Sequence, residues 1–250
     1  MSDTHPRADY GIDAPTVIRN LWLRGSIALV VGVIAYFALQ NAPSFWPSVG
    51  IGVLAVGIVN FISQALFAGV MVWSSRVGKL KARDALLARI PWRGTETVLD
   101  VGCGRGLLLI GAASHLTTGR AIGIDIWHQE HQANNSKEAT LANATAEDVR
   151  DRVEVRDADM RQLPFKDGTM DVIVSNLAIH NVYQRAERAK ALAEIVRVLK
   201  PGGRLAIMDM QHVEQYAEAF REAGLSDVQV SGRDWRIFPP VRTVTASKPN

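Results

Sequence analysis

The sequence predicts an α/β protein, a parallel sheet with helices on both faces, preceded by two membrane-spanning helices. Three observations support this. Residues 98–106 read V-L-D-V-G-C-G-R-G, a strand entering a glycine-rich turn, and an apolar helix follows at once. Downstream, strand-like and helical segments alternate, as in doubly wound sheets. Upstream, residues 25–75 form a run of 51 residues without a charged side chain, which an ordinary soluble domain does not contain.

Composition and charge restrict the function classes. The chain has 250 residues, a formal net charge of +3 and one cysteine, Cys103. One cysteine excludes an intramolecular disulfide and suits a reducing compartment. We interpret Cys103 as a small residue in a tight turn rather than a catalytic thiol, because no partner base is visible. Basic residues gather beside the uncharged run, where lipid accounts for them, so no nucleic-acid partner is expected.

The first 75 residues predict a tail and a hairpin. Residues 1–20 are polar and irregular, and they predict a flexible cytosolic tail without a cleavable signal. Residues 21–75 predict a transmembrane helical hairpin. A segment with two prolines divides the run into residues 25–42 and 49–73, each close to the ~20 apolar residues that cross a bilayer. Tryptophans fall at the expected interfaces, at Trp22, Trp46 and Trp73.

The charges that flank the hairpin predict its orientation. The connection between the spans has no lysine or arginine, whereas basic residues precede and follow the pair: Arg19, Arg24, Arg76, Lys79, Lys81 and Arg83. The positive-inside rule therefore puts both termini and the downstream domain in the cytoplasm, with two spans in the cell inner membrane. The alternative is a hairpin buried in a soluble protein, which the span lengths disfavour.

Small and polar residues within the spans predict close helix packing. Two pairs at i, i+4 spacing would let the helices approach each other: Ala28 with Gly32, and Ala65 with Gly69. Asn60 and Gln64 share one helix face. We interpret them as interhelical hydrogen-bonding groups rather than as direct substrate contacts.

The rest of the chain divides into a linker and an α/β domain. Residues 76–93 predict a basic amphipathic linker helix, with cations near anionic headgroups. Residues 94–250 predict the domain that holds the cofactor. Its strands are expected at 97–101, 120–125, 152–157, 170–176, 203–209, 227–231 and 242–247, and its helices at 106–116, 136–148, 184–199 and 212–223. In such a sheet, ligands bind at the carboxyl ends of the parallel strands.

The glycine turn predicts a site for a nucleoside-type cofactor. Glycines at 102, 104 and 106 leave no Cβ in the way of a ligand, and the following helix presents its N-terminal N–H groups. Asp125 ends the next strand, where a carboxylate suits a ribose diol. Position 107 is leucine, so the dinucleotide pattern G-x-G-x-x-G is absent. The glycines alone do not choose the cofactor.

Five segments, in order, resemble the motifs of the class I S-adenosylmethionine-dependent methyltransferases: residues 98–106, 122–125, 159–165, 165–176 and 194–203. The likeness is to the small-molecule branch that includes quinone and sterol methyltransferases, and the whole chain resembles a membrane-anchored bacterial group with an N-terminal two-helix hairpin. Met160 departs from the alanine usual in the third motif. The resemblance implies a Rossmann-like seven-stranded fold with an antiparallel last strand, and S-adenosyl-L-methionine as the cofactor.

The resemblance also implies roles for individual residues. Asp125 binds the ribose hydroxyls, Asp159 contacts the adenine amine, and Asp100 either approaches the aminoacyl end or braces the turn backbone. The full set of expected cofactor-binding residues is Asp100, Gly102, Gly104, Gly106, Asp125, Ile126, Trp127, Asp159, Met160 and Asn176. Ile126, Trp127 and Met160 form the apolar adenine slot, and Asn176 ends the motif that lies beside the methyl donor.

The chemistry points to one candidate base. Methyl transfer needs a base only when the nucleophile must lose a proton, and His180, after the fourth strand, is placed for that task. The alternative is a structural histidine that caps a helix or lines the pocket. His128, Glu130 and His131 have no second ligand cluster, so no metal site is expected.

The sequence therefore predicts a membrane-anchored, cytoplasm-facing methyltransferase for a small or lipid acceptor, with the bilayer as its other partner. The anchor either presents a lipophilic acceptor or only tethers the enzyme. Two other functions stay open: an NAD-dependent oxidoreductase, and a non-catalytic sensor or scaffold with a retained cofactor pocket. The acceptor, the atom methylated and the oligomeric state are not predicted.

Overall fold

The computed structural model describes residues 8–127 and 135–250. Contacts divide the chain into two compact units. Ile12–Arg76 forms a helical unit, and Met1–Gly11 joins Val77–Asn250 in an α/β unit.

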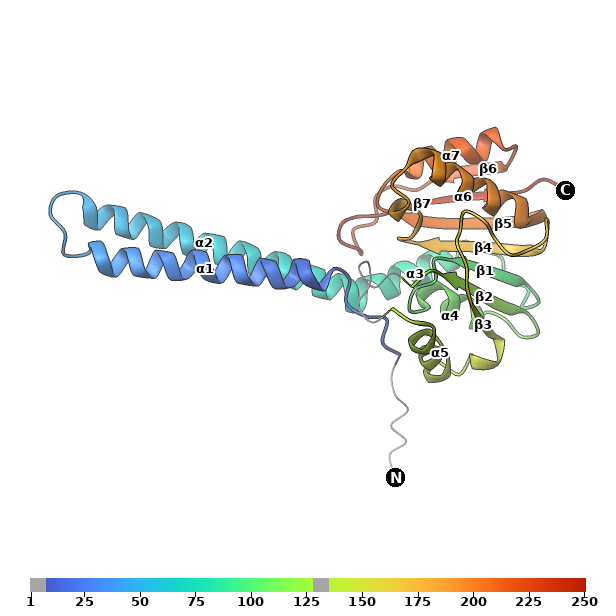
Figure 1. Ribbon diagram of the computed structural model, residues 1–250, viewed down its shortest axis with the longest axis horizontal. Helices are drawn as coiled ribbons and strands as arrows, with labels where there is room; N and C mark the ends of the chain where they lie inside the picture. Colours follow the sequence, from blue (N-terminus) through green and yellow to red (C-terminus); the bar gives the residue numbers. More distant parts are fainter. Residues whose placement is uncertain (1–7, 128–134) are drawn as a thin grey trace, which may run out of the picture. The chain divides into compact units, whose positions relative to one another are not determined.

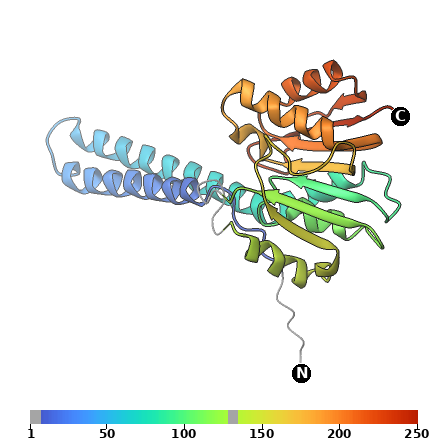
Figure 2. The same ribbon diagram turned by 45° about the vertical axis from the view of Figure 1, so that its right-hand side comes forward.

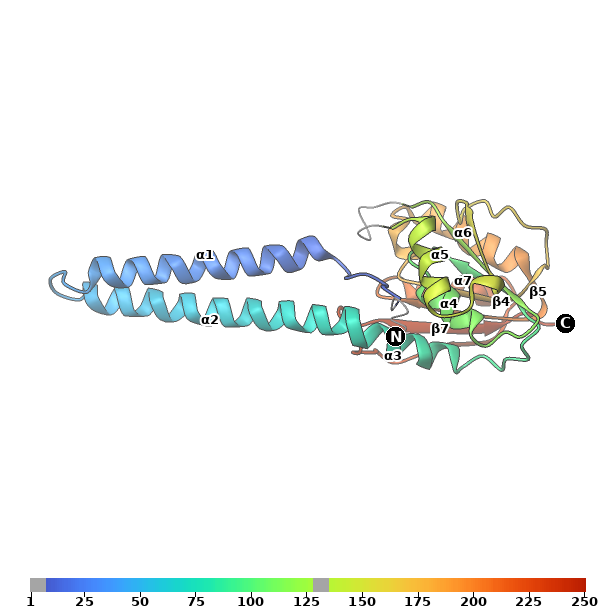
Figure 3. The ribbon, with the colours of Figure 1, turned by 90° about the horizontal axis from the view of Figure 1, so that it is seen from below.

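The helical unit is an antiparallel pair, α1 (Pro15–Leu39) and α2 (Trp46–Trp73), shown in Figures 1 and 3. Two helical stretches, Pro15–Leu39 and Trp46–Leu87, are long and apolar enough to cross a membrane, with mean hydropathies of 1.8 and 2.0. A core helix of a soluble protein passes the same test of length and composition. Only 11% of each apolar window is buried, however, so most of this apolar surface has no protein cover within the part of the chain described.

Glycines set the contact between α1 and α2. A Cβ added at Gly57 would lie 2.6 Å from the Ala28 carbonyl oxygen, and one at Gly32 would lie 3.0 Å from the Cα of Leu54. The approach at Gly57 leaves no room for a side chain, and the approach at Gly32 would require the facing backbone to shift by a few tenths of an ångström. The first expected small-residue pair therefore lies in the contact. The second does not, because a Cβ at Gly69 would meet nothing within 4 Å.

The expected interhelical hydrogen bonds of Asn60 and Gln64 are not formed among the described residues. Asn60 is exposed on the outer surface of α2. Gln64 instead packs by its stem, since its Cβ would lie 3.2 Å from a Cβ placed on Gly25. Asn60 and Gln64 are four residues apart on α2, but α1 covers only part of that face of α2. Gln64 therefore contacts α1, whereas Asn60 does not.

The expected irregular tail does not extend to residues 15–20, which are helical. The helix α1 begins at Pro15, a residue whose fixed φ suits the first helical turn. Before it, Tyr10 is buried in the α/β unit. The backbone N–H of Asp9 donates to Asn143 Oδ1 at 2.9 Å, and the Asp9 carboxylate lies 2.9 Å from an Nη of Arg105. These contacts bind residues 9 and 10 to the glycine-turn side of the sheet.

The linker helix is shorter than the expected 76–93. A π-helical turn, η1 (Ser74–Gly78), precedes α3 (Lys79–Leu87). Lys79 is buried and its Nζ donates to the carbonyls of Tyr10 and Gly11 at 2.8 and 2.6 Å. This corrects the expectation that the Lys79 ammonium faces lipid headgroups.

The α/β unit is built on one seven-stranded sheet with the order β3-β2-β1-β4-β5-β7-β6 (Figure 2). The five strands from β3 to β5 are parallel, and β7 is antiparallel to both of its neighbours. The bounds are β1 (Thr97–Val101), α4 (Leu107–Ala113), β2 (Arg120–Asp125), α5 (Lys137–Ala146), η2 (Arg150–Arg152), β3 (Val153–Asp157), β4 (Met170–Asn176), η3 (Ile179–Asn181), α6 (Arg185–Val198), β5 (Leu199–Asp209), α7 (Val213–Glu222), β6 (Ser226–Val230) and β7 (Arg242–Ser247). The Rossmann-like fold and the antiparallel strand are as predicted.

Two apolar layers hold the helices to the sheet. One layer packs α3 and α4 on one face, and the other packs α6 and α7 on the opposite face (Figure 1). Because both faces are covered, β1 is buried from Val98 to Val101. The carboxyl ends of β1, β2, β4 and β5 remain as the edge at which polar side chains meet.

Candidate active site

The glycine turn between β1 and α4 depends on left-handed backbone conformations. Gly102, Gly104 and Gly106 have φ values of +73°, +49° and +86°, which other residues rarely adopt. A Cβ on Gly102 would lie 2.3 Å from the Cβ of Ala178, and one on Gly106 would lie 2.8 Å from Ile110 Cδ1. The missing side chains thus make room for the protein's own packing.

Asp125, at the end of β2, is bound to this turn. One carboxylate oxygen accepts the Gly104 N–H at 2.8 Å, and the other accepts the Trp127 N–H at 2.7 Å. Asn135 Nδ2 lies 3.5 Å from the same carboxylate. The two chain segments predicted to share a site therefore meet, and Asp125 still has acceptor capacity because a carboxylate offers about four lone-pair positions.

Asp100 and Asn176 are buried acceptors at the ends of adjacent strands, β1 and β4. Asp100 is 1% exposed, and its Oδ1 has no hydrogen-bond partner among the described residues. Burial raises the pKa of Asp100 to about 8, although the Leu109 N–H works against this shift. The Asn176 Oδ1 is likewise buried without a donor in the described chain. Buried acceptors of this kind are rare and call for a donor from elsewhere.

Burial also raises the pKa of Cys103, with Asp100 as the next cause. A buried thiol that stays protonated is a poor nucleophile. The interpretation of Cys103 as a packing residue agrees with this environment.

The expected adenine-slot residues lie near the same edge but differ in their contacts. Ile126 is 51% exposed. Trp127 has a φ of +57°, and its indole N–H donates to Asp157 at the end of β3. The Met160 Cε would lie 3.7 Å from a Cβ on Gly102. Asp159 forms a bidentate pair with Arg161, which holds the pKa of that carboxylate below its usual value.

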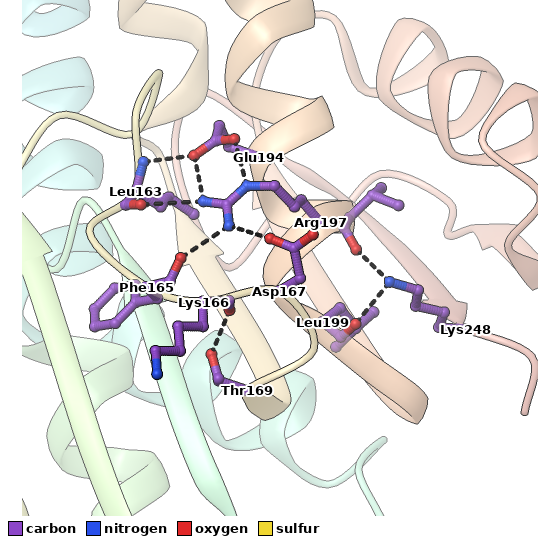
Figure 4. A network of polar contacts seen from close by, with 10 residues as sticks. Leu163, Phe165, Lys166, Asp167, Thr169, Glu194, Arg197, Leu199 and Lys248 are labelled. Atoms are coloured by element: carbon purple, nitrogen blue, oxygen red, sulfur yellow. Dashed lines mark hydrogen bonds and ion pairs between the residues drawn. The ribbon is translucent and has the colours of Figure 1, made fainter.

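A charged clamp fixes the loop that follows Asp159 (Figure 4). Glu194 on α6 accepts the Leu163 N–H at 2.7 Å and binds Arg197. Arg197 donates to the Leu163 and Phe165 carbonyls at 3.1 and 2.8 Å and pairs with Asp167. The motif at residues 159–165 and the motif that begins at residue 194 are therefore two halves of one structural contact.

His180 lies in η3, beside the end of β5. Its Nδ1 is 2.6 Å from Asp209 Oδ1, and its backbone N–H donates to Asp209 Oδ2 at 3.1 Å. Asp209 is 1% exposed, whereas the His180 side chain is 12% exposed. The buried carboxylate therefore lies at ion-pair distance from Nδ1, although this nitrogen makes no hydrogen bond of regular geometry among the described residues.

Sequence reasoning did not identify Asp209. It ends β5 next to β4, and its carboxylate also accepts the Met210 N–H at 2.8 Å and the Tyr216 hydroxyl at 3.2 Å. Burial, with the Asp209 charge, raises the pKa of Tyr216. The sequence feature that could have identified Asp209 is its position, as an acidic residue at the carboxyl end of a predicted parallel strand.

The other candidates lie elsewhere. His128, Glu130 and His131 fall outside the described residues. Within the described ranges, no group of three metal-ligating side chains occurs. The segment 232–240 packs onto α3, because Ile237 is buried and Arg236 donates to the Lys81 carbonyl at 3.2 Å.

Comparisons with known proteins agree with this geometry. A family described as "Methyltransferase domain" matches residues 99–207. The chain is 32% identical over 157 residues to 27-O-demethylrifamycin SV methyltransferase of Amycolatopsis mediterranei, which covers 60% of this chain and 54% of that protein. It is 34% identical over 134 residues to demethylmenaquinone methyltransferase of Lactiplantibacillus plantarum, which covers 53% of each. The chain spans about half the length of these curated relatives.

Among solved structures, one similar fold is a putative S-adenosyl-L-methionine-dependent methyltransferase from Methanococcus maripaludis. The TM-score is 0.54 at 21% identity, and the match covers 76% of this chain and 90% of that chain. At this identity the likeness shows the shared fold.

Proposed function

We propose that this chain, whose α/β unit belongs to the class I S-adenosylmethionine-dependent methyltransferases, is a membrane-anchored enzyme that methylates a small lipophilic acceptor. The observation that carries the proposal is a matched pair of unsatisfied acceptors, Asp100 and Asn176, beside a glycine turn bound to Asp125.

These residues fit S-adenosylmethionine. The cofactor has an ammonium group, a ribose diol and an adenine, and it lacks the phosphates of a dinucleotide. An ammonium supplies three N–H donors, and Asp100 and Asn176 each bury an oxygen without a donor among the described residues, as does Asn135 beside Asp125. Asp125 retains capacity for a diol, and Ile126 offers exposed apolar surface for a base. Asp159 can accept the adenine amine if the carboxylate is shared with Arg161.

When bound, the cofactor supplies an electrophilic methyl group on a sulfonium, and the protein supplies alignment. His180 is proposed as the base. Its Nδ1 lies 2.6 Å from Asp209, and we assign to Nε2 the role of taking the proton of the acceptor as the nucleophile attacks. The buried Asp209 charge stabilises the imidazolium that results. This assignment favours an acceptor with an acidic proton, on a hydroxyl, an amine or an activated carbon.

Two observations support a membrane site and a lipophilic acceptor. The hairpin exposes large apolar side chains, such as Ile34, Val56 and Leu66, which are 62%, 69% and 66% exposed. Lipid is the solvent that such a surface suits. One relative is named for demethylmenaquinone, a lipophilic quinone, and another for a rifamycin. The orientation with both termini in the cytoplasm rests on the flanking basic residues.

A labelling experiment tests the proposal. Membranes that contain the full chain are incubated with methyl-labelled cofactor and extracted with organic solvent. Label in the organic phase is expected, and His180→Gln should lower the rate by about 10²–10⁴-fold with unchanged cofactor affinity. Label confined to protein or to water-soluble products would overturn the lipophilic acceptor.

Calorimetric titration separates the other two functions. S-adenosylhomocysteine should bind and NAD should not. Binding of NAD alone would favour an oxidoreductase. Binding of S-adenosylhomocysteine without turnover in any cell extract would favour a sensor or scaffold.

A further inference from the structure

One surface of the α/β unit, which we call the docking edge, consists of Tyr183, Trp235, Arg89, Arg185 and Arg233. Four large apolar side chains are exposed among the described residues of this unit: Val77, Ile126, Tyr183 and Trp235. Ile126 is assigned above to the cofactor. The two aromatic residues are the most exposed of the set, at 80% and 64%.

Both aromatic residues lie at one edge of the sheet. Tyr183 follows β4 after η3, and Trp235 precedes β7. Strands β4 and β7 both flank β5, and the register pairs Asp209 at the end of β5 with Arg242 at the start of β7. Neighbouring strands are about 4.8 Å apart. Tyr183 follows η3 on the β4 side of β5, and Trp235 follows Asp234, which bridges to Val241 at the start of β7 on the other side of β5. Their segments therefore flank the strand end that carries Asp209, the partner of His180.

The charge around these aromatic residues is positive. Arg185 and Arg233 are each two positions from an aromatic residue of the edge, and Arg89 lies close enough to Asp234 to lower the pKa of that carboxyl. In the described chain, no ion pair engages Arg89, Arg185 or Arg233. The nearby carboxylates already have partners, since Asp234 pairs with Arg236 and Glu187 pairs with Arg161 and Lys190.

We infer that the docking edge binds the surface of an anionic lipid bilayer. Aromatic rings with a polar atom favour the headgroup level, and each arginine near an anionic surface adds to the attraction. The inference rests on the proposed function, because it brings the edge that carries His180 to the phase in which a lipophilic acceptor dissolves. The acceptor then reaches the imidazole without crossing water.

Fluorescence at single cysteines tests the inference. The only native cysteine, Cys103, is buried, so an introduced cysteine is labelled selectively. Full-length Tyr183→Cys and Trp235→Cys carry an environment-sensitive dye and are reconstituted in phosphatidylcholine vesicles with or without phosphatidylglycerol. The matched control is Thr118→Cys, an exposed site before β2 at the amino edge of the same sheet.

The dyes at 183 and 235 should shift to the blue in anionic vesicles and be quenched by headgroup-level spin-labelled lipid, whereas the dye at 118 should not. Each of the single substitutions Arg89→Gln, Arg185→Gln and Arg233→Gln should lower the ratio of docked to undocked protein by about fivefold. Equal emission at all three dye positions would overturn the inference. So would a blue shift that follows protein concentration without lipid, because it would mark a second copy as the occupant.

Cofactor binding is measured on the same labelled proteins. Loss of S-adenosylhomocysteine binding in proteins that still dock would contradict the proposed function and leave the docking edge intact. Cofactor binding with no docking would contradict only the inference.

Discussion

Asp100 combines burial with an acceptor that no described donor satisfies, and this predicts a pH-dependent cofactor affinity. Its pKa is raised to about 8 by burial, so below that pH the group is neutral before binding. A cationic ammonium favours the ionised form. Affinity for S-adenosylhomocysteine should therefore fall by up to about tenfold per pH unit below about pH 8. Calorimetry from about pH 6 to about pH 8.5 measures the slope.

The neutral variant Asp100→Asn is the control. Its affinity for S-adenosylhomocysteine should show no such slope, and above about pH 8 the variant should bind more weakly by roughly 10- to 100-fold, the contribution of a charge-assisted hydrogen bond.

The same raised pKa of Asp100 makes the folded state retain a proton that the unfolded chain releases above about pH 3.9. Wild-type stability should thus decline between about pH 4 and pH 8 relative to Asp100→Asn. Parallel melting curves would contradict the raised pKa.

Asp209 predicts a separation of rate from affinity. An asparagine at 209 presents either an N–H or a weaker acceptor to His180 Nδ1, so the imidazole is no longer held as a base. Asp209→Asn should lower the turnover rate by about 10²–10⁴-fold while cofactor affinity stays unchanged. Tyr216→Phe, which removes only a 3.2 Å hydrogen bond to the same carboxylate, should cost about 1 kcal/mol of stability and leave turnover largely intact. Label transfer in membranes and calorimetry measure both quantities.

The glycines and Asp125 could be placed from the sequence because they are close to strand ends that the apolar pattern marks. Asp209 could not be paired with His180 in that way. The contact joins η3, which follows β4, to the end of β5, 29 residues further along the chain, and the apolar pattern of a strand does not report which polar side chains meet at its end. Likewise, the contacts of Asp9 with Arg105 and Asn143 link positions about a hundred residues apart, which no local pattern reports.

At the scale of elements, the clamp between α6 and the 159–167 loop predicts coupled losses. Arg197→Ala removes the contacts to the Leu163 and Phe165 carbonyls and leaves Glu194 without its cation. We expect a loss of about 2 kcal/mol in unfolding free energy and weaker cofactor binding, because Asp159 and Met160 lie on the same loop. Chemical denaturation and calorimetry test this. Lys190→Ala, whose side chain is 62% exposed, should change stability by less than about 0.5 kcal/mol.

The hairpin glycines give a matched pair of substitutions. Gly57→Ala puts a Cβ 2.6 Å from the Ala28 carbonyl oxygen, so the helices must separate, at a cost of about 1–3 kcal/mol. Gly69→Ala meets nothing within 4 Å and should gain up to about 1 kcal/mol from helix propensity. The fraction of protein that stays monodisperse after heating in detergent compares them. Equal behaviour of the two variants would contradict the packing.

The sequence predicted that α1 and α2 pack through small residues but chose one of the two sites wrongly. A helix that is apolar on every side carries no pattern that fixes its rotation about its axis. The sequence therefore does not show whether Gly57 or Gly69 faces α1.

The strands were predicted better, since β1, β2, β4 and β7 occupy the expected ranges. Each is a short apolar run bounded by glycine, proline or charge, and such boundaries are local.

For the whole molecule, the flanking charges predict a topology that single cysteines can test. Arg19 and Arg24 lie in the N-terminal part of α1, further basic residues follow α2, and the connection between the helices has none, so the connection should cross to the outer side. Ser44→Cys lies in that connection and is exposed, whereas Thr118→Cys is an exposed site in the α/β unit. An impermeant maleimide should label position 44 in intact spheroplasts and position 118 only after lysis. The wild-type chain should stay unlabelled, because burial keeps the Cys103 thiol protonated and covered.

Labelling of position 118 before lysis would show the reverse topology. Recovery of the chain in the soluble fraction, with 44 protected, would instead show that protein covers the apolar surface of α1 and α2.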